Sequence, residues 1–166
     1  MDKLDAYALV FQMKANGADF YRGLSGKVEN PGMKSILKEL EEMEEEHLTY
    51  ISGKIAEIRA KYPELSDEMA SETDIYQQQV DKMSIEKYFH DENLGKYFIL
   101  RLAYFIEADF LDFYSQSFRK YTGESKQVFE ELIEMEHKRV KWMKGMIDKE
   151  IGEKGLSPDL YSVEEI

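Results

Sequence analysis

The chain contains no cysteine among its 166 residues. It therefore forms no disulfide bond, no thiolate zinc site and no iron–sulfur or rubredoxin-type centre. No apolar run approaches the roughly 20 residues that a membrane span requires. The first residues, MDKLDAYALVFQ, lack the basic start and the small-residue cleavage site of a signal peptide. We therefore expect a soluble cytoplasmic protein.

Positive charge is scarce as well, with 22 Lys and Arg against 34 Asp and Glu and a net charge of −12. Nucleic acids and anionic membranes are bound through basic patches, so we expect neither as a partner. The hydrophobic fraction of 43%, with nine Phe and eleven Tyr, is that of a globular chain rather than an acidic disordered one. The length suits one domain with a sizeable core.

Proline occurs only three times, and together with glycine it divides the chain into segments with helical spacing of apolar residues. No segment shows the alternating pattern of a strand. The polar stretch 62–90 predicts a long crossover with room for one or two short helices, and 152–166 predicts a tail that packs loosely or meets a partner. The expected helices are 2–24, 32–61, 91–121 and 125–151.

This order predicts an all-α fold. A helical hairpin over 2–61 and a second over 91–151, joined by the crossover 62–90, give a four-helix bundle with one long connection. Residues 1–151 then form the single domain.

A short motif recurs in the two predicted hairpins. Glu44-x-x-His47 lies on the second helix, and Glu134-x-x-His137 lies on the fourth. Residues three apart share a helix face, so each pair can present a carboxylate and an imidazole to one metal ion. One such pair is weak evidence in a glutamate-rich chain, but one pair in each hairpin indicates a repeat.

The helices that precede these pairs also match. ADFY ends at Tyr21, and LDFY ends at Tyr114. Seven residues before Tyr114 stands Glu107, on a face that is otherwise apolar. An acid in that position must be paired, protonated or bound to a metal.

With these motifs the chain resembles the rubrerythrin branch of the ferritin-like superfamily, over residues 4–150. In that family two helices each give one Glu and two others give Glu-x-x-His, and the set holds two irons. The resemblance implies peroxide- or dioxygen-linked redox chemistry on iron, one or two ions per chain, with manganese or zinc as alternatives. An external electron-transfer protein would supply the electrons. The implied metal ligands are Glu44, His47, Glu107, Glu134 and His137.

One ligand position departs from the family pattern, because Lys14 stands seven residues before Tyr21. Three glutamates are balanced by one divalent metal and one ammonium group, so we predict about one metal ion per chain or partial occupancy. Three alternatives stay open. The centre is metal-free, with Lys14 and protonated histidines balancing the acids; a neutral Lys14 binds a second metal; or a rotated helix carries Lys14 to solvent.

Aromatic residues add two further expectations. Tyr21 and Tyr104 share faces with the implied ligands, and they either hydrogen-bond these glutamates or belong to the core. Trp142 and Tyr161 are aromatics without an assigned place in the bundle, which predicts a homodimer or a larger homo-oligomer. Besides redox chemistry, two other functions remain: metal handling without turnover, and a non-catalytic helical scaffold or interaction protein with a decayed metal site.

Overall fold

The computed structural model describes residues 1–64 and 74–166. Within these ranges the secondary structure is helical without a strand, so the predicted all-α class is confirmed. No helix in the described part of the chain is long and apolar enough to cross a membrane. The elements are α1 (Lys3–Lys14), α2 (Gly17–Ser25), α3 (Pro31–Lys61), α4 (Ile75–Met83), the 3₁₀ helix η1 (Ile85–Tyr88), α5 (Gly95–Lys120), α6 (Gly123–Lys154) and α7 (Pro158–Tyr161).

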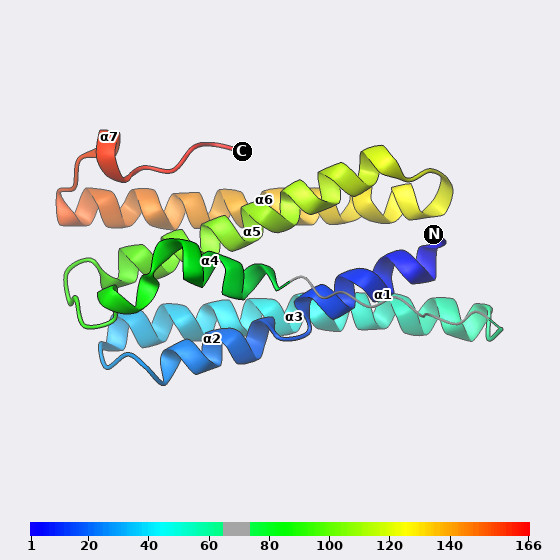
Figure 1. The fold of residues 1–166 in the computed structure, drawn as a ribbon, viewed down its shortest axis with the longest axis horizontal. Helices are drawn as coiled ribbons and strands as arrows, with labels where there is room; N and C mark the ends of the chain where they lie inside the picture. The colour runs from blue at the N-terminus through cyan, green and yellow to red at the C-terminus, as the bar shows by residue number, and fades with distance from the viewer. Residues whose placement is uncertain (65–73) are drawn as a thin grey trace.

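The long helices lie side by side in two groups, as Figure 1 shows. α1 and α2 pack against α3, and α5 packs against α6. α1 also contacts α6, and α3 also contacts α5, so the two groups form one bundle. Complete burial of a Leu or Ile side chain contributes about 1.5–3 kcal/mol. Fully buried residues from four of the long helices fill the interior, among them Leu4, Leu40, Ile51, Leu100, Ile106, Leu132 and Ile147.

Side chains at the N-termini explain where two helices begin. The carboxylate of Asp2 accepts a hydrogen bond from the backbone of Asp5, whose own carboxylate accepts from the backbone of Asp2. This capping box starts α1. The side chain of Asn30 accepts from the backbone of Met33 and caps α3, where Pro31 occupies the first turn.

The first predicted helix is interrupted, which corrects the expectation of one helix over 2–24. α1 ends at Lys14, and α2 begins at Gly17. Asn16 and Gly17 are weak helix formers, and Gly17 leaves space that another side chain uses. A Cβ atom at position 17 would lie 2.4 Å from the hydroxyl oxygen of Tyr76 on α4. The break therefore lets a residue of the crossover reach the interior at the level of Lys14.

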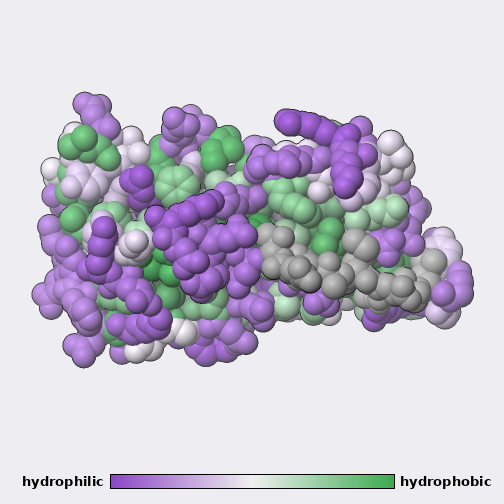
Figure 2. All heavy atoms as spheres, viewed as in Figure 1, coloured by the Kyte–Doolittle hydropathy of each residue, from purple (hydrophilic) through white to green (hydrophobic). Residues whose placement is uncertain are grey.

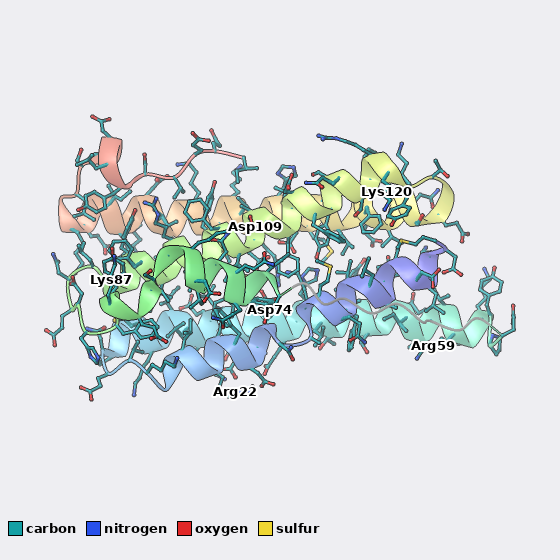
Figure 3. The ribbon with its side chains drawn as sticks, viewed as in Figure 1. Arg22, Arg59, Asp74, Lys87, Asp109 and Lys120 are labelled. Atoms are coloured by element: carbon teal, nitrogen blue, oxygen red, sulfur yellow. The ribbon has the colours of Figure 1, made fainter. Side chains whose placement is uncertain are left out.

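The described part of the crossover contains α4 and η1, which matches the expectation of short helices there; residues 65–73 lie outside the described ranges. α4 packs on α5. The side chain of Gln79 on α4 donates a hydrogen bond to the carboxylate of Asp109, labelled on α5 in Figure 3.

The C-terminal residues pack on α5 rather than extending away from the bundle. The hydroxyl of Tyr97 donates to the carbonyl of Tyr161 at 2.6 Å, and the hydroxyl of Tyr104 donates to the carbonyl of Glu164. Val163 is buried between these contacts. Tyr104 is therefore used to hold the C-terminal segment.

Candidate functional site

Lys14 ends α1 with its ammonium group in the interior of the bundle. The residue is 1% exposed, and Nζ donates a hydrogen bond to Oε2 of Glu107 at 3.1 Å. Nζ also lies 3.0 Å from Oε1 of Glu136 and 3.8 Å from Oε2 of Glu44. The ammonium lies over the ring of Phe110, 4.1 Å from its centroid. Lys14 thus contacts one carboxylate from each of α3, α5 and α6.

A second cation, Arg139 of α6, reaches the same carboxylates. Its Nη1 atom lies 3.6 Å from Oε2 of Glu107, 3.9 Å from Oε1 of Glu136 and 4.0 Å from Oε1 of Glu44. Its Nη2 atom donates to the backbone carbonyl of Met43 on α3. The side chain is only 12% exposed. The centre therefore contains three carboxylates and two cationic side chains.

α3 contributes Glu44 and His47 to this centre, one helical turn apart as predicted. Nδ1 of His47 lies 3.5 Å from Oε1 of Glu136. Oε2 of Glu44 accepts a hydrogen bond of 3.1 Å from the hydroxyl of Tyr76, which enters through the space left by Gly17. The crossover helix α4 thereby covers one side of the centre. We call Lys14, Glu44, His47, Glu107, Glu136 and Arg139 the charge centre.

Both cations keep their protons. Burial lowers the pKa of Lys14, but Glu107, Glu136 and Glu44 raise it by more, so its pKa lies above the usual value. Burial also acts against the charge of Arg139, and the same three carboxylates again outweigh it, raising its pKa. A neutral Lys14 that binds a metal is therefore not supported, and its burial contradicts the alternative in which it reaches solvent.

The pKa values of the carboxyl groups and of the imidazole in the charge centre shift in different directions. Burial would raise the pKa of Glu107, but Lys14 holds that pKa well below its usual range. Burial and the neighbouring charge of Glu107 raise the pKa of Glu136 well above its usual range. Burial raises the pKa of Glu44 to about 7, although Lys14 opposes the shift. Burial, together with Lys14, lowers the pKa of His47 to about 2, which keeps the imidazole neutral.

These directions indicate how the charges are balanced. Lys14, Arg139 and Glu107 favour their charged forms, and Glu136 and His47 favour their neutral forms. Glu44, with a pKa raised to about 7, changes charge near neutral pH. Near-neutrality is what a dry interior requires.

Several polar atoms around the centre have no hydrogen-bond partner among the described residues. Some of them, such as Oε1 of Glu136 and Nη1 of Arg139, still take part in the ion pairs described above. The atoms are Oε1 of Glu44, Oε1 of Glu107, both carboxylate oxygens of Glu136, both ring nitrogens of His47, Nη1 of Arg139, and the hydroxyls of Tyr21 and Tyr114.

Glu134 and His137, the second implied ligand pair, are not brought to the charge centre. Both side chains are exposed on α6. The interior face of this helix carries Phe129, Leu132 and Glu136 at spacings of three and four residues. Positions 134 and 137 share a face with other charged residues instead. The structure thus puts Glu136 and Arg139 where the sequence interpretation expected Glu134 and His137.

A signal in the sequence could have identified the inner pair. Tyr21 precedes Glu44 by 23 residues, and Tyr114 precedes Glu136 by 22, whereas Glu134 follows Tyr114 by only 20. Apolar periodicity on α6 also places position 136 in the stripe of Leu132. The sequence interpretation gave more weight to the repeated Glu-x-x-His motif than to the Tyr-to-Glu spacing or the apolar periodicity.

The residues of the charge centre do not fit the expected metal site. A metal ion would need the carboxylate oxygens that face Lys14 and Arg139, and these two cations lie within 3.0–4.0 Å of all three glutamates. Among residues 1–64 and 74–166, no group of three or more His, Asp or Glu side chains is arranged to hold a metal ion. Two of the side chains that meet here, Lys14 and Arg139, are therefore cations where a metal site would need ligands.

A second polar cluster lies nearer the surface between α1, α3 and α6. The hydroxyl of Tyr7 donates to Oε2 of Glu131 at 2.6 Å, and the hydroxyl of Tyr50 donates to Oε1 of the same carboxylate. Burial and the contact with Glu131 raise the pKa of both tyrosines. This cluster joins three helices and was not anticipated from the sequence, because its members are far apart in the chain.

The comparisons with known proteins leave the charge centre as the main evidence on function. No protein-family model, no curated protein and no solved structure matches the chain.

Proposed function

We propose that this chain is a ferritin-like bundle in which two side-chain cations take the place of metal ions, and that it acts as a non-catalytic helical scaffold or interaction protein. One observation supports this proposal most directly. Lys14 and Arg139 both lie within 4.0 Å of Glu44, Glu107 and Glu136. The positive charge that metals would bring to the family's carboxylates is supplied by the chain itself.

The distribution of the charge centre supports a role in fixing the arrangement of helices. Lys14 comes from α1, Glu44 and His47 from α3, Glu107 from α5, and Glu136 and Arg139 from α6. Buried ion pairs add little net stability, but a shift of any helix would leave charges unpaired. The centre therefore penalises other registers of the bundle, which suits a protein that presents a fixed surface.

Iron-dependent redox chemistry with an external electron donor is the alternative that the family resemblance implies. It is favoured by the residue types of Glu44, His47 and Glu107 and by their unpartnered oxygen and nitrogen atoms. The exposure of Glu134 and His137, together with Arg139 in the centre, makes it the weaker proposal.

Metal content separates the two proposals. The protein is purified from cells grown separately with iron, manganese or zinc supplements, and bound metal is measured by elemental analysis. Thermal unfolding is recorded with and without a chelator. We expect far less than one metal ion per chain and no effect of the chelator on the unfolding temperature. A stoichiometric metal ion whose removal lowers that temperature would overturn the scaffold proposal in favour of metal binding.

A further inference from the structure

A surface groove lies where α4, α5 and the C-terminal segment meet, away from the charge centre. It has a volume of about 490 Å³, and Tyr88, Tyr97, Phe98 and Tyr161 contribute aromatic rings to it. Figure 2 shows hydrophobic and weakly polar side chains reaching the surface between α7 and α4. At the edge of the groove, the side chain of Leu160 is 76% exposed.

The charge of this groove is opposite to that of the whole chain. Its lining includes Lys82 and Arg101 but no Asp or Glu, although the chain has a net charge of −12. Neither cation forms an ion pair with a carboxylate of residues 1–64 or 74–166. Lys82 and Arg101 therefore keep their charge available to a bound anion.

Arg101 is held in position by its neighbours. Its Nη1 atom donates to the hydroxyl of Tyr97 at 2.8 Å, and that hydroxyl donates to the carbonyl of Tyr161 at 2.6 Å. The guanidinium carbon lies 5.4 Å from the centroid of the Phe105 ring. These contacts use part of the guanidinium and fix its plane, so less rotational freedom is lost when its remaining N–H groups bind a ligand.

The aromatic rings of the groove are also held in position, by contacts with one another. Tyr88 and Phe98 are stacked, with ring centroids 3.5 Å apart and planes at 13°. Tyr97 meets Phe98 edge-on at 5.0 Å and Tyr161 edge-on at 5.4 Å. Such a wall offers packing surface to a flat ring at little entropic cost.

We propose that this groove is a binding site for a small aromatic anion, a planar ring that carries a carboxylate, sulfonate or phosphate group. The ring packs among Tyr88, Phe98 and Tyr161, and the anionic group accepts hydrogen bonds from Arg101 and Lys82. A ligand with only one of these two parts would leave either the cations or the aromatic wall unused. The site is independent of the charge centre, so it does not rest on the scaffold proposal.

The test uses 8-anilinonaphthalene-1-sulfonate as the aromatic anion, titrated into the full chain and followed by its fluorescence. N-phenyl-1-naphthylamine, which has the same rings without the sulfonate, and inorganic sulfate serve as the comparison probes. We expect saturable binding of the sulfonate at about one site per chain. The neutral probe should bind at least about tenfold more weakly, and sulfate alone should compete poorly.

Variants connect the binding to the groove. Lys82→Gln/Arg101→Gln should weaken binding of the sulfonate about tenfold or more, and Tyr88→Ala should weaken both aromatic probes. The matched control Lys138→Gln/Lys141→Gln removes two exposed charges from α6 and should leave binding unchanged. Circular dichroism and thermal unfolding show that each variant is folded before it is titrated.

Three results would overturn the proposal. The first is equal binding of the neutral probe, which would indicate an apolar patch only. The second is an equal loss in the α6 control, which would indicate diffuse electrostatic attraction. The third is no saturable binding of the sulfonate to the unmodified chain.

Discussion

Nζ of Lys14 lies 3.1 Å from Oε2 of Glu107, and both side chains are completely buried. Removing the ammonium while keeping the length of the side chain should therefore leave buried carboxylates without their nearest counter-charge. We expect Lys14→Met to lower the free energy of unfolding by about 3–5 kcal/mol, measured by urea denaturation. Lys34→Met, at an exposed position of α3, is the control and should change it by less than about 0.5 kcal/mol. Equal stability of the two variants would contradict the ion-pair description.

The contributions of Glu44 and Glu136 to stability should fall as the pH rises from 5 to 8. The pKa of Glu44 is raised to about 7 in the folded chain, so between its unfolded pKa and pH 7 the folded state binds more protons than the unfolded state. The contribution of Glu44 to the free energy of unfolding is fully present below its unfolded pKa and is lost as the pH rises through 7. The loss is at most about 3 kcal/mol. The raised pKa of Glu136 acts in the same direction. The lowered pKa of His47 acts in the opposite direction below about pH 7, because the unfolded state binds a proton there that the folded state does not. The lowered pKa of Glu107 affects stability only in more acidic solution.

Urea denaturation at pH 5, 6, 7 and 8 measures this dependence. Glu44→Gln and Glu136→Gln each replace an acid with a neutral side chain of the same shape, so the stability of each variant should fall less, or rise more, between pH 5 and 8 than that of the unmodified chain. Glu134→Gln, at an exposed position on the same helix as Glu136, should keep the pH dependence of the unmodified chain. An identical pH dependence in all three variants would show that other groups cause it.

A metal site should appear only when both cations are replaced. Lys14→Glu/Arg139→His gives four glutamates and two histidines in the interior, which two divalent ions would neutralise. We expect about two ions per chain in this double variant by elemental analysis, and at most about one in Lys14→Glu alone, because Arg139 remains. Adding His137→Gln to the double variant should not change the metal content. Loss of metal on that addition would restore His137 as a ligand.

Two glycine substitutions should have opposite effects. A Cβ at Gly17 would lie 2.4 Å from the hydroxyl of Tyr76, so Gly17→Ala should displace α4 and increase hydrogen exchange in Ile75–Met83. Gly53 lies inside α3, where an added Cβ atom would meet nothing within 4 Å among the described residues. Gly53→Ala should therefore raise the free energy of unfolding by about 1 kcal/mol. Unchanged exchange of α4 in the first variant would contradict the role given to Gly17.

Self-association remains a prediction, and Trp142 is the residue that tests it. Its side chain is 42% exposed on α6, whereas Tyr161, the other expected contact residue, packs against Tyr97 within the chain. We expect sedimentation velocity to show a dimer that Trp142→Glu dissociates. Tyr62→Glu, at another exposed aromatic, is the control. A monomer at high micromolar concentration would refute the prediction.

The helical class and most helix bounds followed from apolar periodicity. α3, α5 and α6 begin and end within four residues of the expected positions, because burial of a continuous stripe determines both the sequence pattern and the helix. The break after Lys14 did not follow, since it depends on Tyr76, which lies about sixty positions away. Local propensity at Asn16 and Gly17 gave only a weak indication.

The charge centre was predicted in part. Lys14, Glu44, His47 and Glu107 were identified as interior residues, and the structure brings them together. Glu136 and Arg139 were missed because a motif was given more weight than the periodicity of its own helix. The interior face of a helix is set by the apolar residues around a polar one, so Leu132 was the better guide to the register of α6.

The positive charges in the interior of this bundle are covalent parts of the chain. A metal centre must be loaded after synthesis and can be lost to a chelator, mis-loaded with a competing ion or altered by oxygen. Lys14 and Arg139 arrive with the polypeptide in fixed number and fixed oxidation state. Under the proposal that these cations take the place of metal ions, the interior of the protein is completed in the folding reaction itself, at the same stoichiometry in every molecule and in any supply of metal.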